Sequence, residues 1–454
     1  MSRADTTTRA GAFAAAALLL LAPAIWNGFP LMFFDSGAFI EQAITGEFVP
    51  ERSVFYSWFL KLFQLRLSLW IAVAAQTAAT IWVMAEFARA TAPEFAPDKA
   101  PGRFLAIVLV LALGTGLPWY AGQVLADIWA PLMVLSLYLL GFHAGALDWK
   151  RRFGLMAVVV LAATSHASHL GLAGGLVVVT AAAEMIARRR GIGAPLRRPS
   201  PSWAMPAAAF ALSLALIVGS NFARTGEAFF SRAGSAFVFA RLLQDGIVKR
   251  LLDDTCPRSG YALCIHKDNL PRTANDWLWS GATPFWEMGA FTGTEAESRR
   301  IIVDSLKRYP LMHAETALRA MAEQFVTFST GDGIEPQNHL LVPVFDKFLP
   351  GQLDAYNAAR QQNRQISFAW INPVHLAVGT ASLLAAAIML ALAAGRPRAA
   401  WDDGFYLPAF LLLALLGNAF ICGAMSNPHD RYQSRLIWTV TFAVLLLVAP
   451  RRKS

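Results

Sequence analysis

The residues best suited to chemistry are carboxylates, histidines and arginines at the ends of apolar segments. They are Asp35, Asp127, His166, His169, His429, Arg431 and Arg435. Ionisable side chains within or beside membrane spans are costly and by default suggest function. If the segments cross a bilayer alternately from a cytoplasmic N-terminus, all seven residues face the outer side. The pattern therefore predicts one extracytoplasmic site.

Two carboxylates are candidates for binding or acid–base roles. Asp35 follows two phenylalanines at the end of the first apolar segment. Partial desolvation there would disfavour its ionised form, which suits a general base, although an ordinary helix N-cap also explains an aspartate here. Asp127 lies one turn into another apolar segment. It serves either a site or an ion pair with an arginine or histidine of a neighbouring helix.

His166 and His169 share one turn between two apolar segments. Their i, i+3 spacing would let them hold a divalent metal together with a carboxylate. No HExxH-like helix accompanies them, and substrate hydrogen bonding or plain loop structure are the alternatives. We therefore expect no required cofactor, while a divalent metal stays open.

Residues 426–435, Ser-Asn-Pro-His-Asp-Arg-Tyr-Gln-Ser-Arg, form the most specific local feature. Arg431 and Arg435 are four residues apart and share one face of a helix that begins here. Guanidinium groups bind phosphate oxygens through paired donors, and a helix N-terminus favours an anion. With His429 and Tyr432 beside them, they predict a phosphate site. Ion pairing to nearby carboxylates or lipid headgroups is the alternative.

The composition indicates an integral membrane protein. Of its 454 residues, 56% are hydrophobic and 15% charged, whereas soluble domains carry roughly 25% charged residues. The net charge of +9 comes largely from basic clusters beside segment ends, which the positive-inside bias assigns to the cytoplasm. These clusters are at 150–152, 188–190, 396 with 398, and 451–453. We expect no nucleic-acid partner.

Ten apolar segments are expected to cross the membrane. They are about 13–33, 68–87, 104–117, 123–142, 153–164, 170–186, 205–222, 371–392, 405–425 and 436–448. The predicted fold is an all-α polytopic membrane protein of about ten transmembrane helices with both termini cytoplasmic. The first segment has features of a signal peptide, but its apolar character continues far enough to span.

The predicted organisation has three parts. Residues 1–222 form an N-terminal membrane module of about seven spans, with a first outer loop at 34–67 that carries two short interfacial helices. Residues 223–368 form a mainly helical extracytoplasmic domain. Residues 369–454 form a second membrane module of about three spans.

Two of the three cysteines, Cys256 and Cys264, lie in the predicted outer domain without His or Cys partners at zinc spacing. Extracytoplasmic compartments are oxidising, so a disulfide that closes this short loop is favoured over two free thiols. The third, Cys422, lies in an apolar segment and is expected to be a small core residue.

Together these features resemble the bacterial GT-C integral membrane glycosyltransferases, which include the lipid A aminoarabinose and galacturonic acid transferases and the protein O-mannosyltransferases. The resemblance lies in an acid after the first span, two interfacial stretches in the first outer loop, a multi-span bundle and a large outer region. The stretch 429–435 is similar to an Arg/Tyr-bearing late outer loop of some members. Many members carry paired acids in the first loop, whereas Asp35 is followed by Ser36, Glu41 and Glu47.

The resemblance implies an inverting glycosyltransferase of the bacterial inner membrane. Its donor would be a sugar on polyprenyl phosphate and its acceptor a periplasmic glycan, lipid or protein, both met among membrane lipids. Asp35 would be the base, and Arg431 and Arg435, joined by Arg52, would hold the donor phosphate. The other substrate-binding candidates are His429, Tyr432, Asp127, His166, His169, Tyr56 and Glu41.

Two other classes of protein stay open. An O-antigen polymerase or ligase would use a polyprenyl-diphosphate donor and confine its essential arginines and histidines to the large outer loop. A transporter or flippase would carry paired charges near the bilayer midplane and broken helices in repeated halves, and the sequence shows neither clearly. Polar residues gathered at one interface favour an enzyme.

Overall fold

The computed structural model describes residues 3–64, 67–189, 202–397 and 400–448. Over these residues the chain is helical, and β structure is limited to an isolated bridge between Leu31 and Gln123. The predicted basic clusters at 188–190, 398 and 451–453, and residues 65–66 of the first outer loop, lie wholly or partly outside the described residues.

Six helices of the described chain are long and apolar enough to cross a membrane. They are α1 (Arg3–Asn27), α4 (Leu69–Thr91), α9 (Ala167–Arg189), α10 (Ala204–Thr225), α20 (Asn372–Ala394) and α21 (Asp403–Ala419) with its π-helical continuation η6 (Phe420–Ala424). A helix satisfies its own backbone hydrogen bonds, which a bilayer interior requires. The chain is therefore an α-helical membrane protein, as its composition predicted.

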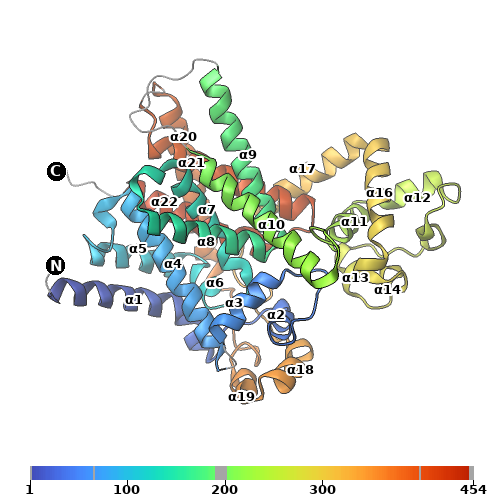
Figure 1. Cartoon of the computed structure of the whole chain (residues 1–454), viewed down its shortest axis with the longest axis horizontal. Helices are drawn as coiled ribbons and strands as arrows, with labels where there is room; N and C mark the ends of the chain where they lie inside the picture. Colours follow the sequence, from blue (N-terminus) through green and yellow to red (C-terminus); the bar gives the residue numbers. More distant parts are fainter. Residues whose placement is uncertain (1–2, 65–66, 190–201, 398–399, 449–454) are drawn as a thin grey trace.

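Four further helices pack among these six. They are α5 (Pro101–Gly114), α7 (Trp129–Phe142), α8 (Trp149–Ser165) and α22 (Asp430–Val448). Each coincides with a predicted span. α7 and the first two thirds of α22 are buried on all sides (Figure 1), so their surroundings are mainly protein.

The first predicted span is too long. It was expected to reach residue 33, but α1 ends at Asn27 because Gly28 adopts a left-handed φ of +86°. The chain then runs extended beside the turn that precedes α7. The Leu31 N–H donates to the Gly122 carbonyl and the Val124 N–H to the Leu31 carbonyl, both at 2.9 Å.

The fourth predicted span begins too early. It was expected from residue 123, but the residues that pair with Leu31 cannot also be helical, and α7 begins only at Trp129. Asp127 therefore lies in a 3-10 turn, η2 (Ala126–Ile128), that directly precedes the first residue of α7, rather than one turn inside the helix.

The predicted first outer loop contains the two expected short helices, α2 (Phe34–Thr45) and α3 (Val54–Gln64). Asp35 is not the N-cap of α2. Phe33 occupies that position, and its N–H donates to the Ser36 Oγ at 2.9 Å. Asp35 instead lies in the first turn, where a carboxylate is favoured by the helix dipole.

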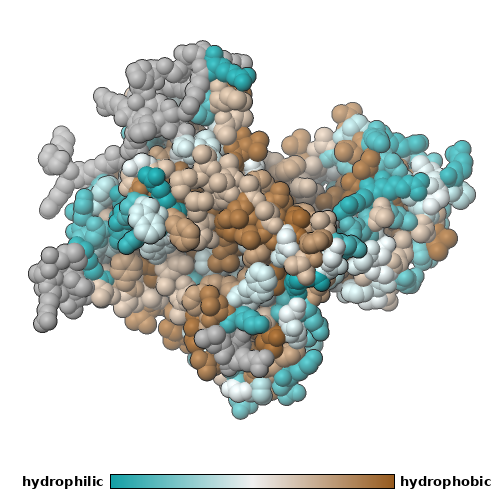
Figure 2. All heavy atoms as spheres, in the orientation of Figure 1, coloured by the Kyte–Doolittle hydropathy of each residue, from teal (hydrophilic) through white to brown (hydrophobic). Residues whose placement is uncertain are grey.

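Residues 233–309 form a domain with a core of its own, here called the outlying domain (Figure 1, right). Its helices are α11 (Gly234–Gln244), α12 (Ile247–Thr255), α13 (Ala274–Trp279), α14 (Pro284–Glu287), α15 (Ala290–Gly293) and α16 (Glu295–Arg308). Trp277 and Phe239 are buried at its centre. The predicted disulfide between Cys256 and Cys264 is present. Figure 2 shows the hydrophilic surface of this domain beside the apolar bundle.

The rest of the predicted outer region packs on the bundle instead. It comprises α17 (Pro310–Val326), α18 (Asn338–Phe348) and α19 (Pro350–Ala358). Phe345 and Tyr356 stack at 4.5 Å and belong to the same core as Phe29. Between α17 and α18 the chain passes over the bundle end in the Asp332 loop (residues 327–337).

Candidate functional site

Asp127 is bracketed by two arginines of α22, and these three residues are called the Asp127 cluster. The Arg435 Nη1 lies 2.5 Å from the Asp127 Oδ1, and the Arg431 Nη1 lies 3.5 Å from the Oδ2. The side chains of Arg435, Asp127 and Arg431 are 0%, 3% and 10% exposed. Two cations share one carboxylate, so the cluster carries one surplus positive charge in a buried setting.

Residues of α3 and α4 hold the turn that carries Asp127 in place. The Gln76 side-chain amide, on α4, donates to the carbonyls of Ala121 and Gln123 at 2.9 and 2.6 Å. It thereby fixes the turn that leads into Asp127. Tyr56, fully buried on α3, donates its hydroxyl to the Gln76 Oε1 at 3.4 Å. The predicted site residue Tyr56 therefore lies behind the cluster as a support.

The Arg431 guanidinium lies between two aromatic rings. Its centre is 4.4 Å from the Phe33 ring and 4.6 Å from the Tyr432 ring, and its Nη2 donates to the Tyr432 hydroxyl at 3.0 Å. Cation–π contacts of this kind favour the charged group and restrict its plane. Phe33 was not predicted as a site residue, and it brings the first outer loop onto Arg431.

Arg435 has polar neighbours on three further segments. Its Nη2 lies 3.3 Å from the Ser168 Oγ, 3.3 Å from the Asn418 Oδ1 and 3.7 Å from the Cys422 Sγ. Its buried Nε has no hydrogen-bond partner among the described residues. Cys422, expected to be only a core residue, is buried as predicted but lies in the π-helical turn η6, a feature often found at functional sites.

His166 and His169 lie beside this group, with ring centroids 5.1 Å apart. The His166 Nδ1 is 2.8 Å from the Ser168 Oγ, and the His169 Nδ1 is 3.1 Å from the Ala162 carbonyl. Burial, followed by the charge of Arg435, lowers the pKa of His166 to about 4, so its imidazole is neutral near pH 7. In the described chain, no group of three or more His, Cys, Asp or Glu side chains is placed to hold a metal.

Asp35 forms an ion pair with Arg52, at 2.5 Å between the Oδ1 and Nη2 atoms. The Arg52 Nη1 also lies 2.7 Å from the Glu51 Oε1. Burial alone would lower the pKa of Arg52, but these two carboxylates outweigh it and raise the pKa. Arg52 was predicted to join the phosphate site and instead neutralises Asp35. Glu41 lies one and a half turns further along α2 and takes no part in these described ion pairs.

The Asp332 loop supplies residues that the sequence did not assign to the site. The Asp332 carboxylate accepts the Arg431 N–H at 3.1 Å and lies 3.7 Å from the His429 Nδ1. Gly333 has φ +73°, and a Cβ there would come within 1.9 Å of the Phe33 ring. Nothing in the sequence links residues 331–333 to residues about 100 positions away.

Gln324 of α17 clamps the start of α22. Its amide donates to the His429 carbonyl at 2.8 Å and accepts the His429 N–H at 2.9 Å. The predicted residue His429 is thus held by its backbone, while its half-exposed ring faces Asp332.

No protein-family model, curated protein or solved structure matches this chain. The candidate site therefore has to be judged on its own geometry.

A second cluster of charged residues lies at the other end of the bundle and was not predicted from the sequence. Glu86 contacts Arg89 at 2.6 Å and Arg151 at 3.3 Å, while Arg89 also contacts Asp98 at 2.7 Å and Arg151 contacts Asp148 at 3.4 Å. We call these five residues the Glu86 cluster. Nearby, buried Asp403 accepts the Tyr138 hydroxyl at 2.8 Å and lies 3.0 Å from the His143 Nε2.

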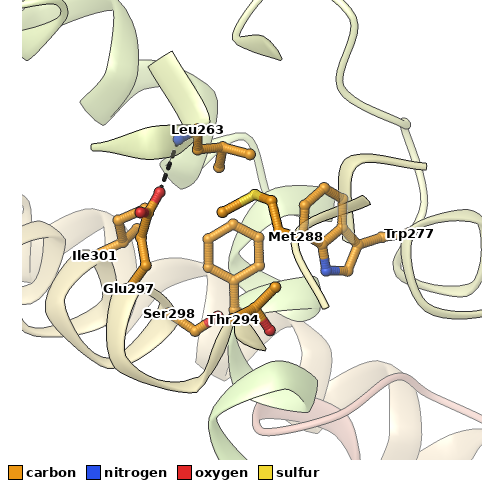
Figure 3. A pocket seen from close by; sticks show the side chains of 8 residues that line it. Leu263, Trp277, Met288, Thr294, Glu297, Ser298 and Ile301 are labelled. Carbon is orange, nitrogen blue, oxygen red and sulfur yellow. Dashed lines mark hydrogen bonds between the residues drawn. The ribbon is translucent and has the colours of Figure 1, made fainter. Parts of the chain in front are cut away.

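A small cavity in the outlying domain is remote from both clusters. It lies between α11, α13 and α16 and is lined by residues such as Phe239, Trp277, Met288 and Ile301 (Figure 3). Its volume of about 10 Å³ is at the lower limit for a single water molecule. It is a packing defect of the domain core rather than a ligand site.

Proposed function

We propose that the chain is an inverting membrane glycosyltransferase of GT-C type that moves a sugar from polyprenyl phosphate to a hydroxyl of a periplasmic acceptor. The observation that supports this most is the surplus positive charge of the Asp127 cluster. A buried guanidinium is costly unless an anion compensates it, and arginine donors match phosphate oxygens. The Arg431 guanidinium contacts the rings of Phe33 and Tyr432. It is the hydrogen-bond donor best placed to bind a phosphate.

In the proposed reaction the acceptor hydroxyl oxygen attacks the anomeric carbon of the sugar. The bond from that carbon to the phosphate oxygen breaks, and the phosphate leaves with the electron pair. Arg431 and Arg435 stabilise the charge that develops on it. Asp35 takes the hydroxyl proton, and its partner Arg52 orients the carboxylate.

The proposal also assigns a topology. All ten bundle helices would cross or enter the bacterial inner membrane with both termini in the cytoplasm. The Asp127 cluster, the Asp332 loop and the outlying domain would then face the periplasm. The oxidising periplasm is consistent with the disulfide between Cys256 and Cys264.

The test is donor turnover by purified protein in nanodiscs. A panel of polyprenyl-phosphate sugars is offered with a mixture of glycan and lipid acceptors, and release of polyprenyl phosphate is followed. The wild type is compared with Asp35→Asn, Arg431→Ala and the control Arg89→Ala. Arg89 is also ion-paired, but to Glu86 and Asp98 in the Glu86 cluster.

We expect release by the wild type and the control, and a loss of at least a hundredfold in both site variants. Release that is indifferent to Asp35 would move the base elsewhere. Release only from polyprenyl-diphosphate donors would favour a polymerase or ligase, and no release by folded protein with any donor would favour a transporter.

A further inference from the structure

The helix α17 has an unpartnered apolar face. Leu311, Leu318 and Val326 are 85%, 65% and 67% exposed. At about 100° per residue they fall within about 80° of one another around the helix axis. Ala314 and Ala322, also exposed, fill the positions between them. An apolar stripe of this length in water requires a covering partner.

The other side of α17 packs against the bundle, and this contact sets the position of α17 along the bundle axis. It crosses η6, the end of the spanning helix α21, so closely that a Cβ on Gly423 would come within 2.5 Å of the Ala320 carbonyl oxygen. Its far end reaches α16 of the outlying domain (Figure 1). Because α17 packs on the last turns of a span, it lies at the level where the bilayer ends.

The end of that span also exposes apolar side chains. Leu416, Phe420 and Met425 are exposed on α21 and just beyond η6, where the candidate spanning helix has to meet lipid. Figure 2 shows apolar side chains both on the bundle and where the bundle meets the outlying domain. A protein partner would have to cover lipid-facing residues as well, whereas a bilayer covers both surfaces at once.

The flanks of the face are charged, as in helices that lie in a membrane interface. Glu315 lies within the arc of the face, about 40° from Leu311, and its carboxylate pairs at 2.9 Å with Arg319, which lies at the edge of that arc. Exposed Lys307 and Arg308 end α16 next to Leu311, where cations would meet lipid headgroups.

We propose that α17 is an interfacial membrane helix whose Leu311–Val326 face rests on the lipid leaflet that adjoins the Asp127 cluster. Through Gln324, the same helix holds the His429 backbone. The lipid surface thus sets the position of His429, two residues before Arg431, and anchors the outlying domain. The inference requires a membrane protein but no particular chemistry.

The test uses a fluorescent thiol label at single introduced cysteines in nanodiscs of phosphatidylethanolamine and phosphatidylglycerol. The labelled variants are Leu311→Cys and Leu318→Cys. Leu384→Cys, on the exposed side of α20, is the lipid control, and Arg272→Cys, on the outlying domain, is the water control. The parent protein sets the background, because Cys422 is buried and the other cysteines are bonded.

We expect brominated lipids to quench both α17 labels at least half as strongly as the Leu384 control, and iodide to quench them several-fold less than the Arg272 control. Iodide quenching equal to that of the water control, without lipid quenching, would overturn the proposal. Protection from both quenchers would also overturn it, because a protein surface would then cover the face.

Discussion

The two ends of the bundle each carry a carboxylate between two arginines, but the settings differ. At one end Glu86 contacts Arg89 and Arg151, whose side chains are 23% and 40% exposed and have further carboxylate partners. At the other end Asp127 is the only carboxylate of the described residues that contacts the guanidinium group of Arg431 or Arg435. Asp332 and Asp430 lie nearby but accept backbone N–H groups.

Charge balance separates a structural clamp from a candidate binding site. By side-chain contacts, the Glu86 cluster sets three carboxylates against two guanidiniums, so it has no use for a further anion. Its arginines are exposed enough for solvent to screen them. The Asp127 cluster is short of one negative charge and is shielded from water, so an anion from outside would complete it.

The largest expected effect is on stability when the shared carboxylate is removed. Asp127→Asn leaves two buried guanidiniums without an anion and should lower the free energy of unfolding by about 3–5 kcal/mol. Glu86→Gln should cost about 1 kcal/mol, because the partners of Glu86 are more exposed and keep other carboxylates. Thermal unfolding in detergent measures both.

Added ligand should stabilise the Asp127→Asn variant more than the wild type. Polyprenyl phosphate should raise the melting temperature of Asp127→Asn more than that of the wild type, because the phosphate replaces the missing carboxylate. Equal losses in Asp127→Asn and Glu86→Gln, with no such rescue, would mean that the two clusters are equivalent.

The next effect is on turnover. Arg435→Gln removes one charged donor to the phosphate, and kcat/KM for the polyprenyl-phosphate donor should fall by about 10–100-fold, the equivalent of roughly 1.5–3 kcal/mol. Arg89→Gln, the matched change in the Glu86 cluster, should stay within about twofold of the wild type. A comparable fall in both variants would point to a general structural defect.

A smaller change in the free energy of unfolding is expected when the pH is lowered. Because the pKa of His166 is about 4 in the folded protein and 6.5 ordinarily, the unfolded chain binds a proton that the folded protein excludes. The free energy of unfolding should be at its full value above about pH 6.5 and fall by about 1–2 kcal/mol towards pH 4. Urea unfolding across this range, with His166→Gln as the control, should show a flatter profile in the variant.

The smallest expected effect concerns the ring beneath Arg431. Phe33→Leu keeps an apolar contact but removes the cation–π interaction, worth about 0.5–1 kcal/mol. The KM for the donor should rise about two- to fivefold, in addition to a small loss of thermal stability from the shortening of a buried ring. An unchanged KM would show that the ring contributes packing only.

Much of the fold follows from local pattern, because apolar runs of sufficient length must form helices in a bilayer. The pairing of Arg431 with Arg435 was equally local, since residues four apart share a helix face. The end of α1 was misplaced because the residues after Gly28 are as apolar as the helix before it. The helix ends where Gly28 turns left-handed, and the pairing of Leu31 with a turn about 90 residues away holds the following residues extended.

The partners of the site residues could not be read from the sequence. Asp332 reaches Arg431 and His429 only because the Asp332 loop folds back over Phe33. Arg52 looked like a phosphate ligand because nothing in the sequence sets its distance from Asp35. Glu86 and Arg89 have the spacing of an ordinary helix ion pair, so the second cluster gave no distinguishing signal.

The most direct measurement is the binding of a polyprenyl phosphate to the wild type, Arg435→Gln and Arg89→Gln in nanodiscs. If the surplus charge of the Asp127 cluster holds the phosphate, the wild type and Arg89→Gln should bind with equal affinity, and Arg435→Gln at least about tenfold more weakly. Equal binding by all three proteins, or no binding by the wild type, would contradict the central claim.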